Sequence, residues 1–388
     1  MNLGMFITPN HTVPPDDPAI AAPWHIVGAL SDELTRRNRF VVSLFAPIGS
    51  KTTASLYDFS TPPTIRTASS LSKDAYQKKE ADDEAVFFHR MMEVGKEKNI
   101  HLFHLHQALR MYPLILRAPK ECLFLITLHD PMTGKKRDAV LELSTLSNCF
   151  FVSISNSQRS DVKADFAGTV YHGLDLGKFP FSASEAYGFS VFGRIIPVKG
   201  QDDAIEACKR VGAPLTIIGQ AVRDTEENRT FWEKHILPQI DDSHIRYVPF
   251  IHRGDLPPYY QRTKAILMPI KWEEPFGLVM IEAMSSGTPV VAYNRGSVPE
   301  IIKDGVTGFI IDPDPSADGQ VPGRTGKGTW VIKKQGVDGL VEAMGRIGEI
   351  DRLACRKHVE EHFTVETMAT GYETIYEKIL RGRSQIIS

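Results

Sequence analysis

Cysteine, long apolar runs and net charge are all scarce in this sequence. The cysteines are too far apart for the short spacing that marks a zinc or redox site; they are Cys122, Cys149, Cys208 and Cys355. No apolar run is long enough to span a bilayer, and the first residues lack the basic region of a signal peptide. We therefore expect free thiols and a cytoplasmic protein.

The charge balance argues against nucleic acid as a partner. The 45 basic and 47 acidic residues leave a formal net charge of -2, so no overall field attracts a polyanion. Two small basic groups stand out, namely Arg36, Arg37 and Arg39, and Lys378, Arg381 and Arg383. Each group is typical of a solvated face, and the alternative is a peripheral contact with anionic lipid at the inner face of a membrane.

Length and patterning together predict two α/β domains. A chain of 388 residues exceeds what one hydrophobic core usually serves, and 42% hydrophobic with 24% charged residues is typical of a globular protein. Short β-rich apolar runs alternate with helical segments such as Trp24–Arg37 and Asp74–Lys98, which indicates parallel sheets covered by helices. In the first half the expected strands are Leu3–Ile7, Val41–Ala46, Leu102–Leu105, Cys122–Leu128, Phe150–Ile154 and Thr169–Tyr171.

The same rhythm restarts after a linker-like stretch, His172–Tyr187, which contains glycine, proline and serine. The second series of expected strands is Phe189–Phe192, Leu215–Ile218, Ile245–Val248, Ala265–Met268, Pro289–Ala292 and Gly308–Ile311. We therefore divide the chain into an N-terminal domain at 1–180, a C-terminal domain at 181–364 and a final helical segment at 365–388. A long surface loop is expected at Asp312–Gly328, where the Asp-Pro-Asp start is typical of turn chemistry rather than of a metal site.

The segment Trp272–Met284 carries the strongest functional pattern. It predicts a tight loop followed by a buried helix, with Pro275 in the first positions of that helix. The helix start would offer free amide groups and a positive dipole end, which suit a diphosphate. The residues expected to bind the donor there are Phe276, Gly277, Leu278 and Val279. Glu274 and Glu282 flank this terminus about 10 Å apart, at distances suited to sugar and ribose hydroxyls. Alternatively, Glu282 is an ordinary helix carboxylate and Glu274 is a negative charge that stabilises the start of the helix.

The joint spacing of these residues resembles the E-x7-E signature of the family 4 retaining glycosyltransferases. That resemblance implies the GT-B architecture, in which two Rossmann-like doubly wound domains face a central cleft and a C-terminal helix crosses back to the N-terminal domain. It also implies that the N-terminal domain binds the acceptor and that the C-terminal domain binds the nucleotide sugar.

A second motif resembles the same family. Gly193 and Arg194 begin a loop after the first strand of the second domain, and Lys199 and Gly200 end it, as in the family's G-R-x-x-x-x-K-G pattern. In the absence of a metal, the charge on a departing diphosphate must be met by fixed cations, and Arg194 and Lys199 would supply them. Two loop cations in solvent are the plain alternative.

Histidines gather near strand ends in the first domain. His129 follows the expected strand Cys122–Leu128, at the edge where open α/β sheets bind ligands. The family often has a histidine there that reaches the donor sugar, so the resemblance implies a catalytic role for His129. For His101, His104 and His106 we expect mixed faces of a strand, and structural or acceptor-side roles rather than metal binding. The loop Thr8–Pro23 departs from the family, because it has no glycine where many relatives have two.

The resemblance implies a retaining hexosyltransferase that needs no metal or other cofactor. His129, Arg194, Lys199 and Glu274 would be catalytic, a UDP-sugar is favoured as donor with GDP-mannose as the other choice, and a saccharide, lipid-linked or small-molecule hydroxyl would accept the sugar. Two alternatives remain open: a nucleotide-sugar epimerase of the same fold, and a non-catalytic nucleotide-binding Rossmann protein. The latter would require a G-x-G-x-x-G run that Leu3–Pro23 lacks.

Overall fold

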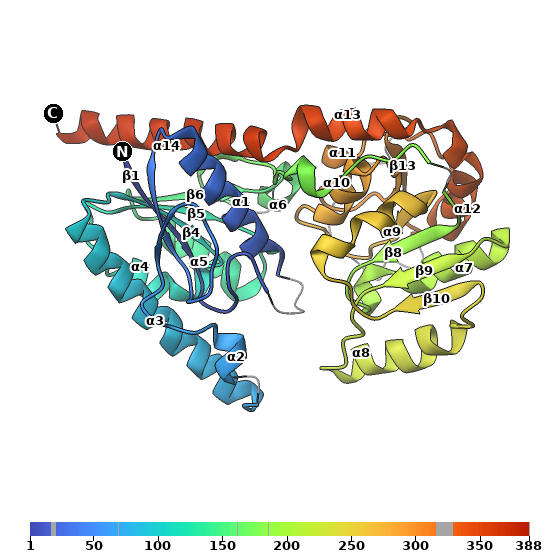
Figure 1. Cartoon of the computed structure of the whole chain (residues 1–388), viewed down its shortest axis with the longest axis horizontal. Helices are drawn as coiled ribbons and strands as arrows, with labels where there is room; N and C mark the ends of the chain where they lie inside the picture. The colour runs from blue at the N-terminus through green and yellow to red at the C-terminus, as the bar shows by residue number, and fades with distance from the viewer. Residues whose placement is uncertain (17–20, 69, 161, 185, 316–328, 388) are drawn as a thin grey trace. The chain divides into compact units, whose positions relative to one another are not determined.

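The computed structural model describes residues 1–16, 21–68, 70–160, 162–184, 186–315 and 329–387 (Figure 1). The chain forms two compact units. Unit 1 combines Met1–Leu174 with Val365–Ser388, and unit 2 is Asp175–Thr364. The C-terminal segment therefore belongs to the same unit as the N-terminus.

Unit 1 is built on a seven-stranded parallel sheet with the strand order β3-β2-β1-β4-β5-β6-β7. Its strands are β1 (Asn2–Ile7), β2 (Val41–Phe45), β3 (Ser55–Tyr57), β4 (Leu102–His106), β5 (Leu123–Thr127), β6 (Cys149–Ser153) and β7 (Phe166–Thr169). Its helices are α1 (Ala22–Arg37), α2 (Thr64–Ala68), α3 (Lys73–Glu97), α4 (Tyr112–Ile115), α5 (Gly134–Leu143), α6 (Asn156–Arg159), α14 (Val365–Ile387) and the single turn η1 (Leu109–Met111).

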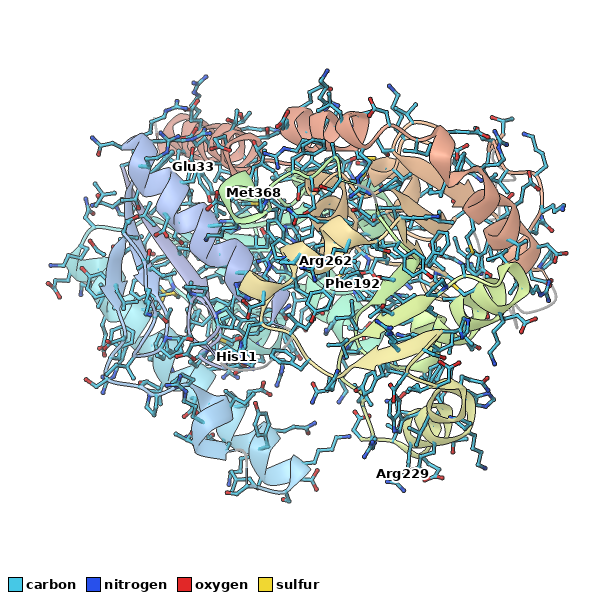
Figure 2. All side chains as sticks on the ribbon, turned by 45° about the vertical axis from the view of Figure 1, so that its right-hand side comes forward. His11, Glu33, Phe192, Arg229, Arg262 and Met368 are labelled. Atoms are coloured by element: carbon cyan, nitrogen blue, oxygen red, sulfur yellow. The ribbon has the colours of Figure 1, made fainter. Side chains whose placement is uncertain are left out.

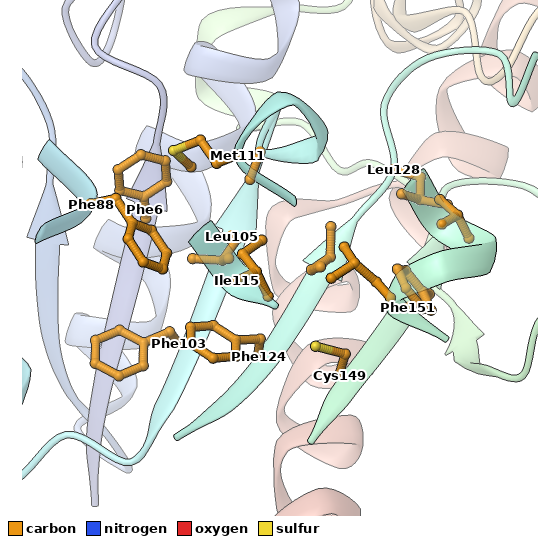
Figure 3. Close-up of a cluster of buried hydrophobic side chains, with 14 of the residues drawn as sticks. Phe6, Phe88, Phe103, Leu105, Met111, Ile115, Phe124, Leu128, Cys149 and Phe151 are labelled. Carbon is orange, nitrogen blue, oxygen red and sulfur yellow. The ribbon is translucent and has the colours of Figure 1, made fainter. Parts of the chain in front are cut away.

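The two faces of this sheet have different partners. Because side chains alternate along a strand, Phe103 and Leu105 of β4 point to one face, while His104 and His106 point to the other. The first face is covered by aromatic and aliphatic side chains of α3 and neighbouring segments (Figure 3). Gly95 lets α3 approach the sheet closely, since a Cβ there would lie 2.4 Å from the ring of Phe103.

The second face carries polar groups and is covered by α14. His104 Nδ1 hydrogen-bonds the hydroxyl of Tyr376 at 2.7 Å, and the hydroxyl of Tyr372 lies 3.0 Å from Thr127 Oγ1 on β5. All four side chains are buried, so α14 is held to the sheet by paired polar groups as well as by apolar contact.

Charged pairs also tie α14 to α1. Arg37 donates to Glu373 at 2.9 Å and to Glu33 at 2.8 Å, and Arg39 donates to Glu373 at 3.2 Å. Glu33, labelled in Figure 2, is 6% exposed, and Glu373 is 3% exposed. Arg37 of the first basic group is thus largely buried in ion pairs of its own unit. Arg36 and Arg39 also form ion pairs but stay 67% and 54% exposed, as expected of a solvated face. No helix within the described residues combines the length and apolar character needed to cross a membrane.

Unit 2 is built on a six-stranded parallel sheet with the order β10-β9-β8-β11-β12-β13. Its strands are β8 (Phe189–Phe192), β9 (Leu215–Ile218), β10 (Ile245–Val248), β11 (Ala265–Met268), β12 (Val290–Tyr293) and β13 (Gly308–Ile311). Its α-helices are α7 (Gln201–Val211), α8 (Glu226–Thr230), α9 (Pro257–Arg262), α10 (Leu278–Ser285), α11 (Val298–Ile301), α12 (Gly336–Arg346) and α13 (Arg352–His362). Its short turns are η2 (Leu176–Lys178), η3 (Pro197–Lys199), η4 (Phe231–Ile236, π-helical), η5 (Leu237–Gln239), η6 (Arg253–Asp255) and η7 (Ile347–Glu349).

Each sheet has a point where the strand order reverses. In unit 2 the chain passes from β8 through β9 to β10 and then returns to β11 on the other side of β8. In unit 1 it passes from β1 through β2 to β3 and returns to β4. Ligands of open parallel sheets bind at the carboxyl ends of the strands beside such a reversal.

Two edge strands of unit 1 differ from expectation. The expected strand Thr169–Tyr171 is wrong by several residues, because the sheet ends with β7 at Phe166–Thr169, and the short strand β3 was not expected. None of the residues of β7 and β3 is buried, so neither strand leaves a strong apolar signature. Part of two expected loops, at 17–20 and 316–328, lies outside the described residues.

Candidate functional site

In unit 2 the loop after β8 meets the loop after β11. Lys199 ends the turn η3, and its Nζ donates a hydrogen bond to Glu274 Oε2 at 2.7 Å. The indole Nε1 of Trp272 donates to the same oxygen at 3.1 Å, and the Lys199 ammonium lies 4.8 Å from the centre of the Trp272 ring. Glu274 is 9% exposed, so its carboxylate is held by two donors in a largely water-excluded position.

A glycine makes the close approach of these loops feasible. Gly200 follows Lys199 with a φ of 68°, and a Cβ at this position would lie 1.9 Å from the carbonyl oxygen of Pro269. A larger residue would therefore push the loop after β8 away from the segment that leads to Trp272 and Glu274. Among the described residues, Oε1 of Glu274 has no hydrogen-bond partner and is left for a ligand.

The helix after Glu274 begins later than the sequence suggested. The expectation that Pro275 occupies the first positions of the helix is wrong, because α10 begins at Leu278 with Gly277 as its N-cap residue. Gly277 has a φ of 81°, which breaks the helical backbone before it. The first amides, those of Leu278 and Val279, precede the first intrahelical acceptors and point out of the helix start. Phe276 instead packs its ring in the core, 2% exposed, against Phe363.

Glu282 lies inside α10 and is held by two residues that the sequence did not single out. Arg253 donates from Nε and Nη2 to Glu282 Oε1 at 2.9 and 2.6 Å, and the Tyr260 hydroxyl donates to Oε2 at 2.8 Å. Glu282 is 4% exposed. The burial of Tyr260 and the nearby Glu282 carboxylate together raise the pKa of the Tyr260 hydroxyl well above its usual value. The Arg253 guanidinium also lies 5.6 Å from the centre of the Phe179 ring.

The other loop cation, Arg194, is placed differently from Lys199. Gly193 has a φ of 130°, and Arg194 is exposed, with only its backbone oxygen engaged by Gln201 Nε2 at 2.9 Å. Within the described part of the chain, the Arg194 guanidinium makes no ion pair. The structure therefore brings Lys199, Trp272 and Glu274 together and leaves Arg194 on the same loop, free to meet an anion.

A nearby hollow of unit 2 is unsuited to a diphosphate. It has a volume of about 390 Å³ and is lined by Pro197, Asp202, Glu226, Glu227, Thr230, Phe231, His235 and Lys271. Its one lysine, Lys271, is already paired with Asp202 and Asp203 at 2.9 and 2.8 Å. The carboxylates of Asp202, Glu226 and Glu227 in this hollow would repel an anion. The start of α10 is therefore the better candidate for an anion site.

In unit 1, His129 follows β5 and joins a buried histidine pair. Its Nε2 lies 2.9 Å from His106 Nδ1, and its ring stacks on His172 at 5.2 Å. His129 is half-buried, and the packing around its ring lowers its pKa to about 4, an effect that Asp130 partly offsets. His104 and His106 share one face of β4 with ring centres 4.1 Å apart, while His101 is exposed and precedes the strand.

Comparisons with known proteins agree with this architecture. Residues 181–321 match the family "Glycosyl transferases group 1". The chain is 26% identical over 323 residues to the putative glycosyltransferase YtcC of Bacillus subtilis, covering 74% of each protein. It is 25% identical to the N-acetyl-alpha-D-glucosaminyl L-malate synthase of Bacillus anthracis, covering 75% of this chain and 78% of that protein.

Two solved structures share the fold. The sucrose-phosphate synthase of Thermosynechococcus elongatus superposes with a TM-score of 0.72 at 16% identity, covering 98% of this chain and 100% of that one. The Anabaena protein Alr3699/HepE, solved in complex with UDP-glucose, superposes with a TM-score of 0.66 at 16% identity, covering 98% of this chain and 99% of that one. These structures confirm the predicted GT-B fold. The matched family and the relatives support the predicted resemblance to glycosyltransferases.

Proposed function

We propose that this group 1 glycosyltransferase of GT-B fold is a retaining hexosyltransferase that uses a nucleotide diphosphate sugar and needs no metal. The proposal rests on the hydrogen bonds that Lys199 and Trp272 donate to Glu274, shortly before the N-terminus of α10. One charged pair and one helix start thus lie on neighbouring loops of the same sheet.

The groups at this edge are suited to the parts of a nucleotide sugar. The amides of Leu278 and Val279 and the Lys199 ammonium would meet the diphosphate, because a helix start and a fixed cation both favour negative charge. Oε1 of Glu274 would accept a hydrogen bond from a sugar hydroxyl. Glu282 would accept from the ribose, on the far side of the phosphates, while Arg253 and Tyr260 hold its carboxylate in place.

The proposed reaction exchanges one bond to the anomeric carbon for another on the same face of the sugar. The bond to the diphosphate oxygen breaks and its electron pair leaves with the nucleotide. The acceptor hydroxyl forms the new bond, and its proton passes to the departing diphosphate. Lys199, with Arg194 from the same loop, would stabilise the charge that develops on the leaving group, which is the main task of the protein in this scheme.

The donor is proposed to be a UDP-sugar, with GDP-mannose as the other choice. The HepE structures with UDP and with UDP-glucose support this order, since they share the fold of this chain. The acceptor hydroxyl would belong to a saccharide, a lipid-linked sugar or a small molecule, and unit 1 is proposed to bind it.

The proposal is tested by incubating the full chain with UDP-glucose, UDP-N-acetylglucosamine, UDP-galactose and GDP-mannose in the presence of EDTA. We expect nucleotide release with one UDP-sugar, accelerated by a suitable acceptor, and a product with the anomeric configuration of the donor by NMR. Loss of all activity with EDTA, restored by Mg²⁺ or Mn²⁺, would contradict metal independence. Conversion of the donor sugar without nucleotide release would instead favour an epimerase.

Matched variants connect the activity to the site. Lys199→Ala and Glu274→Gln should each lower kcat by about 100-fold or more, as loss of a preorganised charge does in other enzymes. Lys209→Ala is the control, because Lys209 is an exposed lysine on α7 whose ammonium donates to Gln239, and this change should leave kcat unchanged. Near-normal turnover in the Lys199 and Glu274 variants would place the chemistry elsewhere.

A further inference from the structure

The strongest unassigned feature is the hydrogen bond between His106 and His129. His106 is the last residue of β4, and it pairs in register with Thr127, the last residue of the neighbouring strand β5. His129 follows β5 two residues later. The bond joins His106 Nδ1 to His129 Nε2 at 2.9 Å. His106 is fully buried, and its other ring nitrogen, Nε2, has no hydrogen-bond partner among the described residues.

Both rings are neutral at physiological pH. Burial lowers the pKa of His106 well below its usual value, and the neighbouring His104, His129 and His172 lower it further. Packing lowers the pKa of His129 to about 4. A neutral imidazole carries one N–H, so the two rings share one hydrogen bond in which one ring donates and the other accepts.

Only two arrangements of the protons are compatible with this bond. If His129 donates from Nε2, the proton of His106 must sit on its Nε2, where a buried N–H has no acceptor. If His106 donates from Nδ1, its Nε2 is left with an unprotonated lone pair. Buried N–H groups without acceptors are rarer and more costly than buried acceptors without donors, so the second arrangement is preferred.

We infer that His106 is a positioning residue that fixes the tautomer of His129, with the His129 proton on Nδ1. His129 then presents an N–H donor at the half-buried carboxyl end of the sheet. A donor at this position suits a substrate oxygen, such as a sugar hydroxyl or ring oxygen, and excludes His129 as the base that removes the acceptor's proton. The role toward substrate depends on the proposed function, whereas the tautomer itself does not.

The rest of the histidine cluster keeps His106 in place. The ring of His104 packs against that of His106, and His104 is itself held at both nitrogens, by Tyr376 on α14 and by Thr127 on β5, each at 2.7 Å. Neither nitrogen of His104 is therefore available to His106. The orientation of the His106 ring is set by packing on one side and by its single bond to His129 on the other.

The direct test is ¹⁵N NMR of the full chain labelled in histidine, because protonated and unprotonated ring nitrogens differ strongly in chemical shift. His129 signals are assigned by their loss in His129→Asn. At pH 7.5 we expect protonated Nδ1 and unprotonated Nε2 in His129, with the same pattern in His106. If the wild-type spectrum instead places the His129 proton on Nε2, the inference is overturned. This outcome requires no variant of His106.

Two variants of His106 separate positioning from packing. His106→Asn keeps an N–H donor near the place of Nδ1, since the asparagine amide is attached at the same carbon, and should preserve the His129 tautomer. His106→Leu keeps bulk without a donor, and should populate the other tautomer of His129. Thermal unfolding of both variants checks that the fold is retained.

Activity should follow the tautomer. With the donor that the wild-type chain uses, His106→Leu should lose at least about tenfold in kcat with little change in the donor KM, and His106→Asn should recover most of that loss. Equal activity in His106→Leu and wild type, with an altered tautomer, would contradict the catalytic consequence. If the wild-type tautomer is as expected but no nucleotide sugar is turned over, the proposed function fails while the tautomer assignment stands.

Discussion

Lys199 and Glu274 lie 75 positions apart in the sequence and form an ion pair of 2.7 Å between loops that follow neighbouring parallel strands. Both side chains are mostly buried, with 18% and 11% of their side-chain surface exposed. The pair therefore behaves as a fixed unit of charge at the edge of the sheet, and the residues that support it can be tested one by one.

The indole of Trp272 supports this pair in two ways that can be separated. Trp272→Phe removes the N–H that donates to Glu274 at 3.1 Å and keeps an aromatic ring below the Lys199 ammonium. Loss of one hydrogen bond to a charged group should lower kcat/KM by about tenfold. Steady-state kinetics measure the effect, with Trp330→Phe as the control because its N–H goes to Asp312 instead. Equal losses in both variants would show that the hydrogen bond to Glu274 has no special importance.

Arg253 should govern donor binding more than turnover. Its guanidinium donates twice to Glu282 Oε1, a geometry that lysine cannot reproduce. Arg253→Lys should therefore raise the donor KM several-fold with kcat nearly unchanged. Arg253→Ala should also lower the free energy of unfolding by about 1–3 kcal/mol, because it leaves a buried carboxylate without its cation. Arg229→Ala, an exposed arginine labelled in Figure 2, is the control. A kcat effect without a KM effect would argue against a role for Glu282 in ribose binding.

Glu84 on α3 is a buried carboxyl whose charge costs stability. Burial raises its pKa from 4.5 to about 8, with a smaller effect from Asp83, and Glu84 Oε1 has no hydrogen-bond partner among the described residues. A raised folded-state pKa means that the stability contributed by the neutral form is complete below pH 4.5 and is lost as the pH rises toward 8. Glu84→Gln should therefore stabilise the chain at pH 8, by on the order of 2–4 kcal/mol, and have little effect near pH 4.5.

Urea unfolding at the two pH values measures the Glu84 effect. Glu97→Gln, an exposed acid at the end of the same helix, is the matched control and should show no such pH dependence. An equal effect of Glu84→Gln at both pH values would contradict the prediction, because it would mean that folding does not raise the pKa of Glu84.

The histidine cluster should make unit 1 sensitive to acid. Three histidines with lowered pKa values contribute, His104, His106 and His129. The groups packed around them include His172, Asp130, Tyr372 and Tyr376. The folded-state pKa of His129 is about 4, against 6.5 ordinarily, so the unfolded chain binds more protons between these values. Stability is then complete above about pH 6.5 and is lost as the pH falls toward 4. Thermal unfolding of wild type and His129→Asn at pH 7 and pH 5 should show a smaller loss in the variant.

The ion pair between Arg37 and Glu373 should fasten α14 to α1. Both side chains are largely buried, and Arg37 also donates to the backbone oxygen of Glu366 at 2.6 Å. A double-mutant cycle with Arg37→Ala and Glu373→Ala should give a coupling of about 1–2 kcal/mol in urea unfolding. Arg36, which is 67% exposed and contacts Glu33 on its own helix, is the control, and Arg36→Ala should leave the urea midpoint almost unchanged. No coupling between Arg37 and Glu373 would mean that this ion pair does not help to hold α14 against α1.

The sequence by itself determined the local elements and the kind of chemistry. Buried parallel strands appear as short apolar runs, which is why β8, β9, β11 and β13 begin and end at the predicted residues. The edge strand β10 also has its predicted bounds, although only Ile245 of it is buried. The spacing of Glu274 and Glu282 and the glycines around Arg194 and Lys199 were also visible, because a helix start and a strand–loop junction are made by consecutive residues. The start of α10 was placed too early because proline favours a helix start, while the left-handed backbone of Gly277 overrides it.

Only the tertiary structure decided which side chains meet. Lys199 reaches Glu274 because the chain leaves β8 for β9 and β10 and returns to place β11 beside β8, an order that no local pattern encodes. The same holds for Arg253 with Glu282, and for His106 with His129 on adjacent strands. Hydrophobic periodicity depends on neighbours along the chain. These contacts depend instead on strand order and on the need of each buried polar group for a hydrogen-bond partner.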